Sequence, residues 1–222
     1  MKRGTVKAIS WDWDQARREL VATDPRLAPV LAATRPPVFR DAEPIAHLAR
    51  SVCAQQLSVK AANTIEGRLR AACGGEITAK ALAALSEARL REIGLSRAKA
   101  TSLAALARAG LDGTLAAHTL RELADAEVVS RLSALPGIGR WTAEVFLLFA
   151  LRRPDVLPAD DLGLRDAAAR MTGDAPGPLT AAALRHMAEP WRPWRSAAAI
   201  GLWAWRHTLV PLPQSRTISK PS

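Results

Sequence analysis

Hydrophobic residues recur every three or four positions along most of the chain, which is the spacing of amphipathic helices. The pattern is clearest over residues 43–73, where the apolar positions at helical spacing are Ile45, Leu48, Val52, Leu57, Ala61, Ile65 and Leu69. Alternation of apolar and polar residues, the mark of a half-buried strand, is hard to find. The pattern therefore predicts an all-α fold.

Breaks and caps divide this pattern into about ten helices within one domain that spans residues 1–222. They are predicted near residues 11–33, 43–73, 79–85, 87–93, 96–110, 122–132, 140–151, 164–170, 180–187 and 193–207. The Asp24-Pro25 step should break the first of them, Ser96 should cap the fifth and Gly110 should end it. The two ends, 1–10 and 210–222, are expected to be flexible.

Charge narrows the choice of partner. Lys and Arg number 31 against 21 Asp and Glu, a formal net charge of +10. An excess of this size favours a polyanionic partner, of which nucleic acid is the commonest. A bias of the genome toward arginine and alanine would give the same excess, so charge alone does not decide.

Cysteine usage and hydropathy argue against an iron–sulfur or zinc protein, a membrane-spanning protein and a secreted protein. Cys53 and Cys73 are the two cysteines, and the four histidines lie far apart, so neither an iron–sulfur cluster nor a zinc site is available. No apolar run reaches the length of a membrane span, and the first residues lack the apolar core of a signal peptide. We expect reduced thiols in a cytoplasmic protein.

Residues 135–139, "LPGIG", join two predicted helices into a helix–hairpin–helix over about 122–152. Gly137 and Gly139 permit an unusual backbone and carry no side chain to block a partner. Backbone amides there, at the positive end of the following helix, suit a phosphate. We predict DNA phosphate contacts at Gly137, Ile138, Gly139, Arg140 and Thr142. The alternative is an ordinary helix connection with a glycine cap.

An aspartate pair, Asp160 and Asp161, stands at the predicted start of the next helix, twenty residues after Trp141. Amides and the helix dipole would keep a carboxylate ionised at such a position. Plain capping of the helix is the alternative interpretation.

These pieces together resemble one family. The stretches "LPGIGRWTA", "LPADD" and "WRPWRSAAAIGLW", with "CAQQLSVKAA" and "GLSRAKATSLAALA", are similar to the HhH-GPD superfamily of DNA glycosylases and to its alkylpurine (AlkA-like) branch. The resemblance covers about residues 12 to 208. It implies the shorter, purely helical form without an N-terminal β domain. Its expected activity is excision of 3-methyladenine-type bases from double-stranded DNA in base excision repair.

The resemblance gives each aspartate a role. Asp161 aligns with the catalytic carboxylate, which would stabilise positive charge on the deoxyribose and orient water. Asp160 would support the loop through hydrogen bonds or an ion pair with Arg165 or Arg170.

The resemblance also implies a base pocket and a wedge. Trp141 and Trp203 would wall the pocket, because aromatic faces attract a cationic purine, and Val145 would tune its width. Gln56, with Leu57 beside it, would fill the gap left by the extruded nucleotide. Core packing of the tryptophans and hydrogen bonding of the glutamines within the fold are the alternatives. The remaining tryptophans interpreted as structural are Trp191, Trp194 and Trp205.

Members that also cleave the DNA backbone carry a nucleophilic lysine where this chain has Trp141. A Schiff base needs an amine, so the resemblance implies a monofunctional glycosylase. It further implies a structural Na⁺ or K⁺ held by the backbone carbonyls near Leu135 and Gly137, and no other cofactor.

Three other interpretations stay open. The chain is a glycosylase for an oxidised or deaminated base, a helix–hairpin–helix DNA-binding protein without catalysis, or a helical transcription regulator. The second has no use for Asp161 beside phosphates, and the third lacks a helix with base-reading Asn, Gln and Arg. We expect a monomer.

Overall fold

The computed structural model describes residues 11–37, 39, 43–173 and 177–208, so both predicted flexible ends lie outside the described residues. In the described part the chain forms thirteen α-helices and one 3₁₀ helix, without a strand. The all-α prediction is therefore confirmed for that part. None of its helices is long and apolar enough to cross a membrane.

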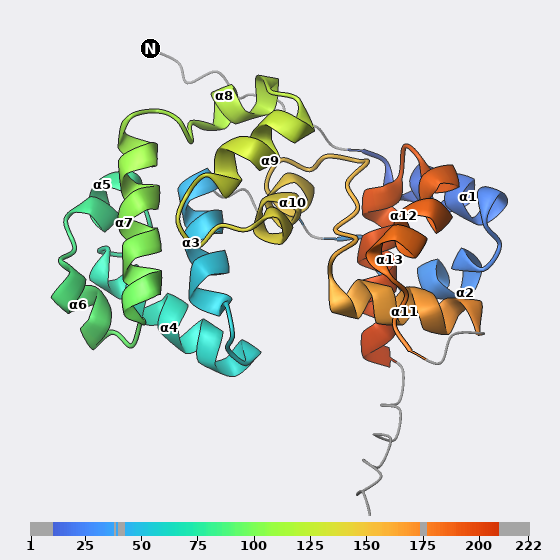
Figure 1. Cartoon of the computed structure of the whole chain (residues 1–222), viewed down its shortest axis with the longest axis horizontal. Coiled ribbons are helices and arrows are strands. Elements are labelled where there is room, and N and C mark those ends of the chain that lie inside the picture. Colours follow the sequence, from blue (N-terminus) through green and yellow to red (C-terminus); the bar gives the residue numbers. More distant parts are fainter. Residues whose placement is uncertain (1–10, 38, 40–42, 174–176, 209–222) are drawn as a thin grey trace, which may run out of the picture.

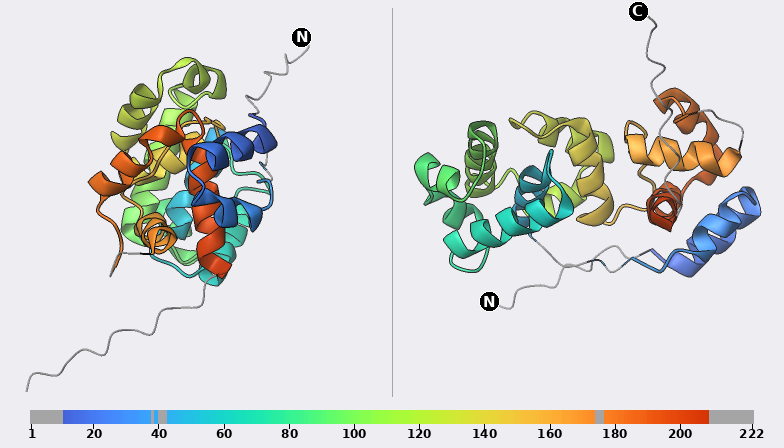
Figure 2. Two further views of the ribbon diagram at one scale, coloured as in Figure 1. Left: turned by 90° about the vertical axis from the view of Figure 1, so that its right-hand side faces the viewer. Right: turned by 90° about the horizontal axis from the view of Figure 1, so that it is seen from below.

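The helices form two groups that share one continuous core (Figures 1 and 2). The larger group holds α3 Pro44–Ala54, α4 Val59–Ala72, α5 Ala79–Ala83, α6 Glu87–Glu92, α7 Arg97–Leu111, α8 Ala117–Glu122, α9 Asp125–Ser133 and α10 Arg140–Phe149. The smaller group holds α1 Trp13–Thr23, α2 Leu27–Ala32, α11 Leu162–Thr172, α12 Ala181–Met187, η1 Glu189–Trp191 and α13 Arg195–Thr208. The chain thus starts in the smaller group, builds the larger one, and returns.

Long-range hydrogen bonds fasten the start of the chain to its end. The Trp191 indole donates to Asp24 at 3.0 Å, and the Trp194 indole donates to Glu19 at 2.6 Å. Trp191 is fully buried. These bonds fix α1 and α2 against the helices that follow the aspartate pair.

The helical pattern over 43–73 is interrupted where the prediction placed no break. α3 ends at Ala54 and α4 begins at Val59, with Ser58 accepting a hydrogen bond from the Ala61 amide as the cap of α4. Gln56, between them, has a φ of 58°. This left-handed residue turns the chain, and the apolar Leu57 that continued the pattern is 41% exposed.

The predicted end of α7 at Gly110 is wrong, because the helix continues to Leu111. A Cβ on Gly110 would lie 2.7 Å from the side chains of Ala79 and Ile45. Gly110 therefore permits close packing of α7 on α5 and α3, and does not end the helix. Ser96 does cap α7, as predicted, by accepting from the Lys99 amide.

Candidate active site

Asp161 is the N-cap of α11, as the sequence predicted. Its Oδ1 accepts a hydrogen bond from the Leu164 amide at 2.6 Å, which satisfies one of the free amides of the first turn. The backbone of Asp161 is extended, with φ −66° and ψ 120°. The helix start therefore fixes the carboxylate in position.

Two indoles donate hydrogen bonds to the Asp161 carboxylate. The Trp203 Nε1 donates to Asp161 Oδ1 at 2.9 Å, and the Trp141 Nε1 donates to Asp161 Oδ2 at 3.0 Å. The predicted catalytic carboxylate and both predicted pocket tryptophans thus meet, although they lie on α10, at the start of α11, and on α13. Hydrogen bonds to both oxygens restrict the rotation of the carboxylate. The arrangement can hold a negative charge in a fixed place beside aromatic surface.

The two rings differ in their surroundings. Trp203 is partly buried and stacks on Phe149 of α10, with ring centroids 6.1 Å apart and an interplanar angle of 21°. Trp141 is 42% exposed, which leaves much of its ring open to a planar ligand. Val145 lies one turn beyond Trp141 on α10 and is half-buried.

The sequence predicted that Asp160 pairs with Arg165 or Arg170, and this prediction is wrong. Both of its oxygens accept from Arg185 of α12, each at 3.0 Å. Arg170 instead pairs with Asp166, four residues earlier on the same helix. Asp160 precedes α11, so its side chain reaches α12 and not the flank of its own helix.

The hairpin has the backbone that its glycines predict. Gly137 has a φ of 76°, and the Ile138 amide donates to the Leu135 carbonyl at 3.1 Å to close the turn. The Ile138 side chain is buried and its amide is already bonded within the turn, so this residue holds the shape of the hairpin. Gly139 is the N-cap of α10 and brings no side chain to the first-turn amides. Those amides remain suited to an anion.

The other two predicted phosphate contacts are altered by burial and pairing. The Thr142 side chain is buried, so only its backbone amide in the first turn of α10 can serve a phosphate. Arg140 is exposed and donates to Glu144 at 2.9 Å along the flank of α10. Burial raises the pKa of Glu144 above its ordinary value, because its effect exceeds the opposing effect of the Arg140 guanidinium.

The carbonyls predicted to hold Na⁺ or K⁺ each accept one hydrogen bond. Leu135 accepts from the Ile138 amide, and Gly137 accepts from the Gln55 side chain at 2.8 Å. A carbonyl has a second lone pair, so the donor set still fits a weakly held cation. Within the described ranges, no three His, Cys, Asp or Glu side chains gather as metal ligands.

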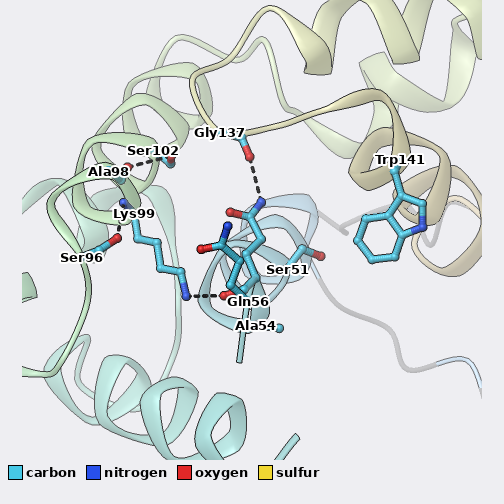
Figure 3. A pocket seen from close by; sticks show the side chains of 10 residues that line it. Ser51, Ala54, Gln56, Ser96, Ala98, Lys99, Ser102, Gly137 and Trp141 are labelled. Carbon is cyan, nitrogen blue, oxygen red and sulfur yellow. Dashed lines mark hydrogen bonds between the residues drawn. The ribbon is translucent and has the colours of Figure 1, made fainter. Parts of the chain in front are cut away.

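The predicted wedge lies beside the hairpin. Gln56 is exposed on the left-handed turn after α3, and the turn borders a cavity of about 580 Å³. The hairpin contributes Gly137 to this cavity, α7 contributes Lys99, and Trp141 lines it from α10 (Figure 3). Trp141 therefore borders the wedge cavity and also contacts the carboxylate.

Hydrogen bonding within the fold, the alternative considered for the glutamines, is found for Gln55. The sequence did not reveal three other side chains that shape this region: Lys99, Phe149 and Arg185. Each acts on a residue far away in sequence, so no local spacing reveals it. The Arg140–Glu144 ion pair, in contrast, follows from spacing in the sequence, because residues four apart on a helix lie next to each other.

Comparison with known proteins agrees with this geometry. Residues 49–193 match the HhH-GPD superfamily of base excision DNA repair proteins. DNA-3-methyladenine glycosylase 1 of Schizosaccharomyces pombe is 37% identical over 164 residues, 72% of this chain and 72% of that protein. DNA-3-methyladenine glycosylase 2 of Escherichia coli is 32% identical over 164 residues, which cover 69% of this chain and 55% of that protein.

Solved structures give the same result. The S. pombe 3-methyladenine DNA glycosylase in complex with abasic DNA has a TM-score of 0.78 and 32% identity, covering 85% of this chain and 95% of that one. A DNA-3-methyladenine glycosidase from Bacillus halodurans also reaches 0.78, with 31% identity, covering 87% and 89% of the two chains. The fold, the hairpin and the match over residues 49–193 together show that this chain belongs to the HhH-GPD superfamily of base excision DNA repair proteins.

Proposed function

We propose that this chain is a monofunctional DNA glycosylase that hydrolyses the N-glycosidic bond of alkylated purines of the 3-methyladenine type. The observation that carries the proposal is the Asp161 carboxylate, held by the Trp141 and Trp203 indoles and the Leu164 amide. The names of the S. pombe and E. coli relatives support the substrate class.

The chemistry needs little acid catalysis, because an alkylated purine already carries positive charge and leaves readily. Positive charge then develops on the deoxyribose, and a fixed carboxylate stabilises it and orients the attacking water. The exposed Trp141 ring offers a face to the extruded cationic base. Asp161 supplies the charge, and the tryptophans keep it in place.

Binding to duplex DNA would rest on the hairpin. The first-turn amides of α10, behind Gly137 and Gly139, would hold a phosphate without reading the base sequence. Gln56 on its exposed turn would enter the stack as the base leaves it.

The absence of lyase activity is part of the proposal. Trp141 occupies the position where the resemblance places the nucleophilic lysine of bifunctional members. Lys99, the lysine that lines the wedge cavity, has its ammonium bound to the Cys53 and Gln55 carbonyls. We therefore expect an intact abasic site as the product and no covalent adduct when borohydride is added during turnover.

A base-release assay tests the proposal directly. Duplex oligonucleotides each carry one lesion: 3-methyladenine, 7-methylguanine, hypoxanthine, ethenoadenine, 1-methyladenine or an oxidised guanine. Release of alkylated purines is expected. Release of only oxidised or deaminated bases would assign another lesion class, and binding without any release would leave a DNA-binding protein.

The two aspartates give a matched pair of variants. Asp161→Asn keeps the shape and one oxygen for the cap but removes the charge and the acceptor for one of the two indoles, so the single-turnover rate should fall by about two to three orders of magnitude. Asp160→Asn removes the negative charge that pairs with Arg185 and should act mainly through stability, by about 1 kcal/mol or less because the pair is exposed. Activity retained in Asp161→Asn, or lost in Asp160→Asn alone, would contradict the assignment.

A further inference from the structure

The turn that carries Gln56 is held in a strained conformation. Gln56 has a φ of 58°, and residues other than glycine adopt this region only when their surroundings impose it. The residues just before it, at the end of α3, are therefore the place to look for what fixes the proposed wedge. Two side chains act there.

Lys99 binds the end of α3. Its Nζ, from the first turn of α7, donates to the Gln55 carbonyl at 2.7 Å and to the Cys53 carbonyl at 2.9 Å. The last carbonyls of a helix lack partners within the helix, and a cation is favoured at that end. Lys99 therefore fixes the direction in which the backbone leaves α3 and enters Gln56.

Gln55 connects the same turn to the hairpin. Its Nε2 donates to the Gly137 carbonyl at 2.8 Å, across 82 residues of sequence (Figure 3). Gly137 in turn lies so close to Ser102 of α7 that a Cβ would collide with the hydroxyl. α7, the end of α3 and the hairpin thus form a closed ring of contacts around one cavity.

We propose that Gln55 and Lys99 are positioning residues that hold the Gln56 wedge at a fixed place relative to the phosphate-binding hairpin. They do not contact the reacting atoms. When the hairpin grips the backbone, the Gln55 bond places the wedge against the stack, so that phosphate binding and base extrusion occur as one event. This inference rests on the proposed function, because the wedge matters only to an enzyme that extrudes a base.

Base extrusion and hydrolysis of the N-glycosidic bond can be tested separately by comparing two substrates. A base in single-stranded DNA needs no wedge to leave a stack, whereas a paired base does. Gln55→Met removes the amide donor at nearly constant size. We expect it to lower the single-turnover rate on a lesion duplex by about five- to tenfold, as loss of one hydrogen bond implies. The rate on the same lesion in a single strand should change by less than about twofold.

A matched control is Gln15→Met, which removes a glutamine bond to Glu19 on α1, in the other group of helices. It should leave both rates unchanged. Equal loss on duplex and single strand in Gln55→Met would show a role in chemistry or stability, and no loss on either would show no role. Both results would overturn the proposal. A wild-type protein that releases no base from either substrate would instead remove the proposed function itself.

The test of Lys99 must distinguish a positioning role from a direct phosphate contact, because a lysine beside DNA can also bind a phosphate. Lys99→Met should lower the duplex rate like Gln55→Met, and Lys99→Arg, which keeps a cationic donor, should lower it less. Since the ammonium is bound to carbonyls, the salt dependence of DNA affinity should stay unchanged. A slope reduced by about 0.9 would make Lys99 a phosphate contact and overturn its positioning role.

The decisive measurement is a double-mutant cycle. If Gln55 acts through the wedge, Gln55→Met should cost nothing further on the duplex once Gln56→Ala has removed the wedge. Additive losses, or a Gln56→Ala variant with the wild-type duplex rate, would overturn the proposal.

Discussion

The indole of Trp203 gives the sharpest perturbation of the active site, because Trp203→Phe removes one N–H and keeps an aromatic ring. The lost bond is the 2.9 Å contact to Asp161 Oδ1. The Leu164 amide still donates to the same oxygen, and Trp141 still donates to Oδ2. The carboxylate keeps its charge and its cap but loses the restraint on one side.

The magnitude follows from the type of bond. A hydrogen bond to a charged group contributes about 1.5 to 3 kcal/mol, and each 1.36 kcal/mol on a barrier is about tenfold in rate. The free energy of the bond sets the upper limit on the loss, because the carboxylate needs no more than that to rotate away. We expect the single-turnover rate to fall by about 10- to 100-fold, with DNA affinity unchanged.

Single-turnover base release, with DNA binding measured in parallel, tests this expectation. Trp194→Phe is the matched control, since it removes an indole bond to a carboxylate, Glu19, away from the active site. It should lower thermal stability without lowering the rate. A Trp203→Phe enzyme with the wild-type rate would refute the view that the indole positions Asp161.

Three further outcomes are expected. Gly137→Ala forces a φ of 76° on a residue with a Cβ and meets Ser102, so unfolding measurements should show a loss of about 1 to 3 kcal/mol or more, reduced by adding Ser102→Ala. The logarithm of DNA affinity should fall linearly with the logarithm of the salt concentration, with a slope of about −0.9 for each phosphate contact. An affinity that does not change with salt would contradict DNA binding. Burial, aided by Arg50, lowers the pKa of His47 from 6.5 to about 4, so the unfolded chain takes the proton first as pH falls. Stability should be full above pH 6.5 and decline toward pH 4 by up to about 3 kcal/mol, and urea titrations of His47→Leu should lack that decline.

The fold was predictable where local physics decides it. Ser96 caps α7 because a serine before a helical pattern accepts a first-turn amide, and the Asp24-Pro25 step breaks the first helix as expected. The break at Gln56 was not predictable, because the apolar spacing continues through it and contacts from distant residues impose its conformation. Gly110 was misinterpreted for a similar reason, since its use is close packing against α5.

The candidate site divides in the same way. The place of Asp161 at the start of a helix was predictable, because an aspartate before a helical pattern is a typical N-cap, whereas its catalytic role stays a prediction. The sequence did not reveal that Trp141 and Trp203 donate to its two oxygens, since that depends on how α10 and α13 meet. Likewise the partner of Asp160 is on α12, and no spacing rule reaches Arg185. Roles follow from motifs, whereas partners follow from tertiary packing.

The return of the chain to its first helices has a consequence for synthesis on the ribosome. α1 and α2 are made first, yet Leu20, Leu27, Val30 and Leu31 belong to a core completed by α13, where Gly201 permits close contact with Leu31. Non-local contacts of this kind form slowly, and exposed apolar faces aggregate. The larger group of helices is translated in between. The apolar side chains of the first helices therefore stay exposed until α13 has been made, and this nascent stage is where a chaperone would be needed most.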